Sequence, residues 1–104
     1  MDSPKSIKEF TDFITTQEIA ILLVKTDACS VCDAVEQQME HGAIHNIKVP
    51  IVKVRLEDVP EISGQYLVFT APTILLFIKG KEYWRGSRFI SYEELNRTID
   101  KFYK

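Results

Sequence analysis

The sequence contains few residues that could cross-link the chain. Its 104 residues include two cysteines, Cys29 and Cys32, which stand close together. A secreted domain that depends on disulfides normally has several pairs that connect distant segments. A bridge between Cys29 and Cys32 would close a very small loop, so it would stabilise the folded chain little through chain entropy. The pair therefore indicates a redox or metal-binding role and not a structural one.

An excess of basic residues and long apolar runs are also absent. The chain has 13 Lys and Arg against 15 Asp and Glu, whereas nucleic-acid-binding domains are usually basic. No apolar run approaches the length of a membrane span, and the N-terminal segment lacks the apolar stretch of a signal peptide. We therefore expect one domain, residues 1–104, that binds neither nucleic acid nor membranes. We expect it in the cytoplasm, where a disulfide would be transient and catalytic.

A short apolar run leads into the cysteine pair. Residues 19–24 are rich in β-branched side chains and show little polar alternation, which predicts a buried strand, and residues 33–40 are typical of a helix. The two thiols therefore lie where a strand ends and a helix begins. The N-terminus of a helix offers unpaired N–H groups and partial positive charge, which favour a thiolate. We predict that Cys29 is the nucleophile and that Cys32, one turn further, resolves a mixed disulfide.

The rest of the chain alternates between helix and strand patterns. The first helix begins at Ser3-Pro4 or, a turn later, at a capping box that starts at Ser6. Gly86 marks a break or bulge in the last strand. The other predicted elements are strands over residues 50–56, 74–78 and 82–85, and helices over 60–66 and after the cap Ser91. The order α-β-α-β-α-β-β-α predicts an α/β fold with a mixed four-stranded sheet between helices on both faces.

Three features of the sequence occur together in register. They are the strand–Cys29-Ser-Val-Cys32–helix segment, the Ala71-Pro72-Thr73 segment before a strand, and Lys79-Gly80 in a hairpin with a capped C-terminal helix behind it. With these features the chain resembles the thioredoxin family over nearly its whole length. The resemblance implies the thioredoxin fold and the reduction of protein disulfides, and we expect the chain to be a monomer. It also implies electrons from a thioredoxin reductase and no bound cofactor.

The resemblance also suggests where a substrate binds. In thioredoxins the proline that corresponds to Pro72 is cis and lies against the cysteine pair. A cis bond here would turn the backbone of Ala71 toward the substrate, and an extended peptide could then pair with it as an added strand. We therefore expect Thr70, Ala71, Pro72 and Ala28 to bind substrate. Phe69 either lines the same groove or belongs to the core.

The chain departs from the thioredoxin pattern at two places. Thioredoxins usually have Trp-Cys-Gly-Pro-Cys, whereas this chain has Ala28-Cys29-Ser30-Val31-Cys32. They also bury an Asp in the central strand where this chain has Leu23, so Lys53, which resembles a lysine near that acid, would lack its partner. Water, Glu57 or Lys53 would then have to take the proton from Cys32. We therefore predict slower resolution of the mixed disulfide than in an ordinary thioredoxin.

Three other functions are consistent with parts of the sequence. The cysteines with His41 and His45 form C-x2-C-x8-H-x3-H, which resembles a zinc finger, but a helix would place His41 about 13 Å from Cys32. A glutaredoxin-type protein would need a second glycine pair after the hairpin, where only Gly86 is present. A binding or adaptor module with a slow thiol pair is favoured by the missing Trp, Pro and Asp and opposed by the intact cysteine pair.

Overall fold

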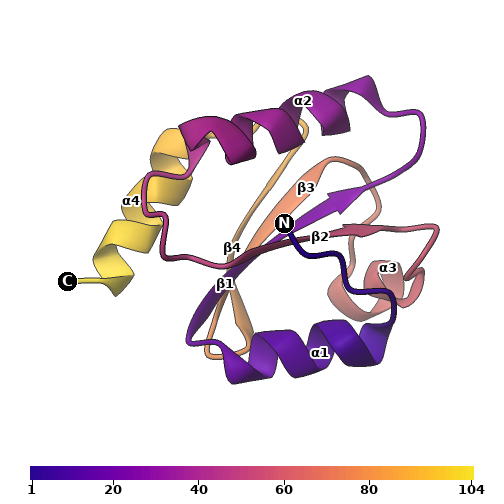
Figure 1. Ribbon diagram of the computed structural model, residues 1–104, viewed down its shortest axis with the longest axis horizontal. Helices are drawn as coiled ribbons and strands as arrows, with labels where there is room; N and C mark the ends of the chain where they lie inside the picture. Colours follow the sequence, from indigo (N-terminus) through magenta and orange to yellow (C-terminus); the bar gives the residue numbers. More distant parts are fainter.

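The computed structural model describes residues 1–104 and is built on one four-stranded sheet in the order β2-β1-β3-β4. Helices α1 and α3 cover one face of this sheet, and α2 and α4 cover the other (Figure 1). The strands are β1 (Ile19–Lys25), β2 (Ile51–Arg55), β3 (Thr73–Ile78) and β4 (Lys81–Ser87). The helices are α1 (Ile7–Thr16), α2 (Ser30–Gln38), α3 (Glu61–Tyr66) and α4 (Tyr92–Phe102), and a π-helical turn, η1 (Met39–Ala43), follows α2. The predicted order of elements and the predicted mixed sheet are therefore confirmed.

The pairing of the strands follows from how they are connected. β1 and β2 pair in parallel across the helical crossover, and β3 pairs antiparallel with both β1 and β4. None of the helices combines the length and the apolar composition needed to span a bilayer. Alternate residues of the central strands face opposite sides, so each strand contributes to two separate cores. Full burial of β1 and β3 on both faces explains their nearly continuous apolar sequences.

The predicted bulge at Gly86 is wrong. Gly86 is paired in register with Ile74, and the irregularity lies further along the hairpin, between Leu76 and Phe77. The reason for glycine is space, because a Cβ at position 86 would lie 2.7 Å from the indole ring of Trp84. That ring is held in place, since its Nε1 donates a hydrogen bond of 2.6 Å to Glu94.

The first helix begins at the later of its two predicted starts. Ser6 is the N-cap, and its Oγ accepts a hydrogen bond of 3.1 Å from the N–H of Glu9. A start at Ser3-Pro4 is wrong because the preceding segment is extended and is held to β2 by a hydrogen bond of 2.9 Å from Lys53 N–H to the carbonyl of Asp2. At the other end of the chain, Ser91 caps α4 as predicted.

Candidate active site at the start of helix α2

Helix α2 begins three residues earlier than predicted, directly at the cysteine pair. Cys29 is its N-cap and forms a disulfide with Cys32, with the two Cα atoms 5.2 Å apart. The Sγ of Cys29 also accepts a hydrogen bond of 3.1 Å from the N–H of Cys32. Cys32 is fully buried, whereas Cys29 remains partly exposed. A reagent in solution can therefore reach the sulfur of Cys29 more easily than that of Cys32.

The cis-proline segment lies beside the disulfide. The Ala71–Pro72 bond is cis, as the family resemblance implied, and Pro72 is buried. Both residues line a groove of about 510 Å³ together with Ala28, Cys29 and their neighbours at positions 30 and 31. None of the hydrogen bonds within the chain uses the N–H or the carbonyl of Ala71. The edge of this groove therefore presents backbone groups that are free to pair with another chain.

Arg88 and Phe89, which the sequence did not predict, form a further part of the groove wall, where the N–H of Arg88 donates a hydrogen bond to the carbonyl of Pro72. Phe89 is 96% exposed, whereas the candidate aromatic residue, Phe69, is exposed outside the groove. Thr70 does not line the groove either, and its carbonyl accepts a hydrogen bond of 2.7 Å from Thr73. The apolar pair Phe89-Ile90 in a loop just before the cap of α4 was the only signal in the sequence for this wall.

A charged cluster links α2 to β1 and β2. Glu36 accepts a hydrogen bond of 2.6 Å from Lys53 and pairs on its other side with Lys25. Lys53 lacks an Asp partner in the central strand, as expected from Leu23, but α2 supplies a different carboxylate, that of Glu36. Lys25 also approaches Asp33 at 3.4 Å. Helical periodicity accounts for this arrangement, since Glu36 is one turn beyond Cys32 and near the same face of α2.

The cluster shifts the acidities of its members. Burial alone would raise the pKa of the Glu36 carboxyl, but the hydrogen bonds and charges of Lys25 and Lys53 outweigh burial, so the pKa is lowered. The hydrogen bond to Glu36 raises the pKa of Lys25 against the opposing effect of burial. Glu36 is therefore held as a carboxylate between two cations near neutral pH.

Position 23 offers no acid, and Glu57, the other side chain considered as a proton acceptor, is bonded to the loop before Cys29. Leu23 is fully buried and adds no polar atom beneath the cysteines. Glu57 accepts a hydrogen bond of 2.8 Å from the N–H of Asp27 and so supports the loop that precedes Cys29. The side chain of Asp27 pairs with Arg55, whose pKa is raised by its hydrogen bonds with Asp58 and then Asp27. The loop is thus fixed by contacts with the end of β2.

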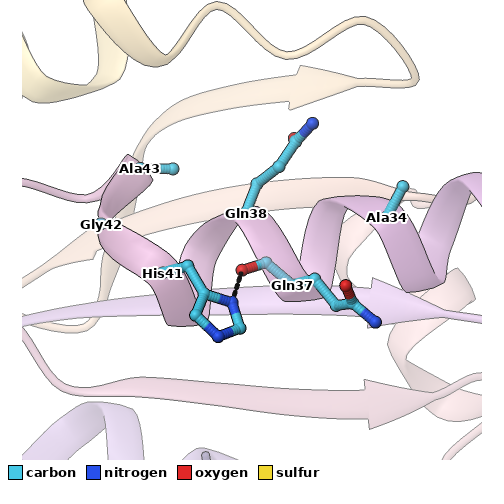
Figure 2. A pocket seen from close by; sticks show the side chains of 6 residues that line it. All are labelled: Ala34, Gln37, Gln38, His41, Gly42 and Ala43. Carbon is cyan, nitrogen blue, oxygen red and sulfur yellow. Dashed lines mark hydrogen bonds between the residues drawn. The ribbon is translucent and has the colours of Figure 1, made fainter.

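The two histidines lie beyond the far end of α2, with His41 in η1 and His45 after it. The Nδ1 of His41 donates a hydrogen bond of 2.8 Å to the carbonyl of Gln37, one turn earlier (Figure 2). The surface hollow in Figure 2 is lined by this end of α2 and by η1, away from the cysteines. Gly42 ends the helical segment with φ of +102°. No three His, Cys, Asp or Glu side chains are placed to hold one metal ion.

Comparisons with known proteins agree with this geometry. A family model described as Thioredoxin matches residues 3–101. Thioredoxin-like protein YdfQ from Bacillus subtilis is 29% identical over 99 residues, which cover 95% of this chain and 88% of that protein. Thioredoxin 1 from Chlorobaculum tepidum is 25% identical over a match that covers 86% of this chain and 91% of that protein.

Solved structures show the same fold at lower identity. A thioredoxin from Plasmodium falciparum has a TM-score of 0.83 at 20% identity and covers 98% of this chain and 99% of its own. A thioredoxin from Fasciola hepatica has a TM-score of 0.82 at 21% identity, and the match covers 97% of this chain and 98% of that protein. The arrangement of sheet and helices is therefore shared with thioredoxins from distant organisms.

Proposed function

Because the chain belongs to the thioredoxin family, we propose that it reduces protein disulfides through Cys29 and Cys32. The family and the Cys29–Cys32 disulfide support thiol–disulfide oxidoreductase activity in general. The observation that carries the finer proposal is the position of this pair, with a partly exposed Cys29 at the first turn of α2 beside an open groove. Reduction of proteins is favoured because the free backbone of Ala71 offers an extended segment a partner.

The exchange takes place in two steps. The thiolate of Cys29 attacks one sulfur of the substrate disulfide, which forms a mixed disulfide and releases the first substrate sulfur as a thiolate. Cys32 then loses its proton and attacks the Cys29 sulfur, which releases the second substrate sulfur. The substrate gains two electrons and two protons and becomes a dithiol, while Cys29 and Cys32 are oxidised to a disulfide.

Helix α2 favours the first step. The N–H of Cys32 already points at the Cys29 sulfur and would stabilise a thiolate there, as would the partial positive charge at the start of the helix. The substrate segment would lie along Ala71 and Pro72, with Ala28 on the other side of the reacting sulfur. Thr70 would contact only the flank of a longer segment.

The second step lacks a carboxylate from the central strand. Leu23 is apolar, Lys53 is held by Glu36, and Glu57 is bonded to the loop before Cys29. Water is then the acceptor for the proton of Cys32, which supports slower resolution than in a thioredoxin with a buried acid. Turnover also needs a two-electron donor, for which a thioredoxin reductase is the candidate, and a reducing compartment such as the cytoplasm.

The decisive experiment equilibrates the pure protein with a glutathione redox buffer and then measures insulin reduction with dithiothreitol. We expect a midpoint near that of thioredoxin, about -270 mV, and loss of insulin reduction in Cys29→Ser. The Cys32→Ser variant should instead accumulate a mixed disulfide with insulin. A far less negative midpoint would indicate an oxidant or isomerase, and no disulfide at all would favour the adaptor function.

A further inference from the structure

The groove over the disulfide contains one charged side chain, that of Arg88. A second hollow continues from the first between α2 and the start of α4, and Arg88 and Phe89 line both. No other residue with a charged side chain lines either hollow. Whatever lies across the disulfide therefore meets one cation and otherwise mainly apolar surface, including Val31, which is 52% exposed.

Arg88 is also the arginine that has no partner within the chain. Of the four arginines in the sequence, Arg55, Arg85 and Arg97 each pair with at least one carboxylate. Arg88 makes no ion pair, although the protein as a whole carries a net charge of -2. Its guanidinium has five N–H donors that can bind a carboxylate in a two-pronged arrangement.

The backbone holds Arg88 in place beside the cis-proline. Its N–H donates a hydrogen bond of 2.9 Å to the carbonyl of Pro72. The N–H of Phe89 donates one of 2.7 Å to the carbonyl of Ser87, which closes a tight turn around Arg88. Arg88 has φ of +63°, a conformation that is costly for a residue with a Cβ. This strained turn keeps Arg88 next to the segment on which a substrate backbone would pair.

From these observations we propose that Arg88 selects protein disulfides in which an acidic residue lies next to the attacked cysteine. The inference rests on the proposed function and specifies its substrate class. A substrate segment that pairs with the backbone near Ala71 would run past the turn that carries Arg88. A neighbouring Asp or Glu of the substrate would then meet the unpaired guanidinium, whereas a Lys or Arg would be repelled.

Three peptides test this selectivity. Each contains one disulfide, and they differ only in having Glu, Gln or Lys on both sides of one cysteine. The fully reduced protein is mixed with each peptide, and the single-turnover rate of disulfide reduction is measured. Each rate is divided by the rate at which the same protein variant reduces hydroxyethyl disulfide, a neutral molecule. This normalisation removes differences in Cys29 reactivity between variants. We expect the Glu peptide to exceed the Lys peptide by about tenfold at low salt. The ratio of the Glu-peptide rate to the Lys-peptide rate should approach one in 1 M salt, where charges are screened within about 3 Å.

Variants assign the selectivity to one side chain. Arg88→Gln should bring the three normalised rates within about twofold, Arg88→Glu should reverse their order, and Arg88→Lys should keep the order. Lys48→Gln makes the same change in net charge as Arg88→Gln, at an exposed residue outside the groove. This control should leave the preference unchanged. A melting curve for each variant establishes that it is folded.

The outcomes separate the inference from the proposed function. Equal rates for the three peptides, a preference for Lys, or the same loss of preference in Lys48→Gln would each overturn the role of Arg88 while disulfide reduction stands. If the wild-type protein reduces none of the peptides, the proposed function fails and the inference fails with it.

Discussion

The face of the sheet under α1 and α3 and the face under α2 and α4 each bury a cluster of eleven apolar residues, but they are built differently. Under α1 and α3, three aromatic rings pack edge to face, with Phe10, Tyr66 and Phe77 at centroid distances between 5.4 and 5.6 Å. Under α2 and α4 the core is mainly aliphatic, and polar contacts fix its edges. The first face supplies packing, and the second positions the cysteine pair.

Two polar contacts hold α2 on its face of the sheet. The cluster around Glu36 ties the second half of the helix to β1 and β2. Asn96 of α4 is buried. Its side chain donates a hydrogen bond of 2.8 Å to the carbonyl of Ala43 and accepts one of 2.9 Å from the N–H of His45. Apolar contacts alone would permit the helix to slide, whereas hydrogen bonds fix its direction and register. The comparison thus indicates that specific polar partners hold the second half of α2 and the turn that follows it.

The largest effect is expected from the aromatic face. Phe10→Ala removes a fully buried ring that packs on both Tyr66 and Phe77, so we expect the free energy of unfolding to fall by about 3–5 kcal/mol. Urea unfolding of the oxidised protein measures this loss, and Phe69→Ala, at a 76% exposed position, is the matched control. The redox midpoint of the folded variant should not change. A shifted midpoint would contradict the separation of packing from chemistry.

A second prediction compares two variants of β1, each of which places an acid on a different face of the sheet. Leu23→Asp places a carboxyl on the cysteine side of β1 in register with Lys53, so we expect resolution of the mixed disulfide to accelerate by about tenfold. Stopped-flow measurement of the second step tests this. Leu22→Asp is equally buried but faces α1 and α3, so it should leave that rate unchanged in the folded fraction. Leu23→Asn, which cannot take the proton, should also leave the rate unchanged.

If Leu23→Asp and Leu23→Asn resolve the mixed disulfide at the same rate as the wild type, the missing acid does not limit the second step. Both substitutions bury a polar group and will lower stability, so rates are compared only under conditions where each variant is folded.

The smallest effect concerns the charged cluster. Glu36→Gln should lower stability by about 1 kcal/mol at neutral pH, because Lys25 and Lys53 lose their shared carboxylate. Since the pKa of Glu36 is lowered from 4.5, its stabilisation is present above that value and is lost as the pH falls through the lowered pKa. The pKa of Lys25 is raised from 10.5, so its contribution is lost only as the pH rises through that raised pKa.

The difference between wild type and Glu36→Gln in urea unfolding should therefore be largest between these limits and shrink toward acid. Glu40→Gln makes the same chemical change at an exposed position of η1 that has no ion-pair partner. Its unfolding free energy should stay within about 0.5 kcal/mol of wild type at every pH. A difference for Glu36→Gln that does not vary with pH would show that the carboxylate charge is not the cause.

The sequence was sufficient for the fold because local signals agreed with one another. The apolar run before Cys29, the cap at Ser91 and the position of Pro72 each predicted an element or a feature that the structure contains. The partner of Lys53 was missed because it depends on how α2 rotates against the sheet, and no local pattern reports that angle. Glu36 looks in the sequence like any solvated helical glutamate.

The groove wall was missed for a related reason. Arg88 and Phe89 follow the last strand in a stretch that looks like an ordinary loop, and only the tertiary fold brings this loop to Pro72. The aromatic residue that precedes Pro72, Phe69, was the nearer candidate along the chain. Proximity in sequence was therefore a poor guide to which aromatic side chain borders the disulfide. The wrong bulge at Gly86 likewise arose because the need for space beside Trp84 is not visible locally.

The contact between Gly86 and Trp84 also limits the order in which this hairpin can evolve. Any side chain at position 86 would overlap an indole ring that is tethered to α4. We therefore expect a mutation at 86 to lower stability in the present background, and to lower it less once position 84 has changed to a smaller residue. The two positions are therefore expected to form an epistatic pair, in which prior replacement of Trp84 makes replacement of Gly86 easier.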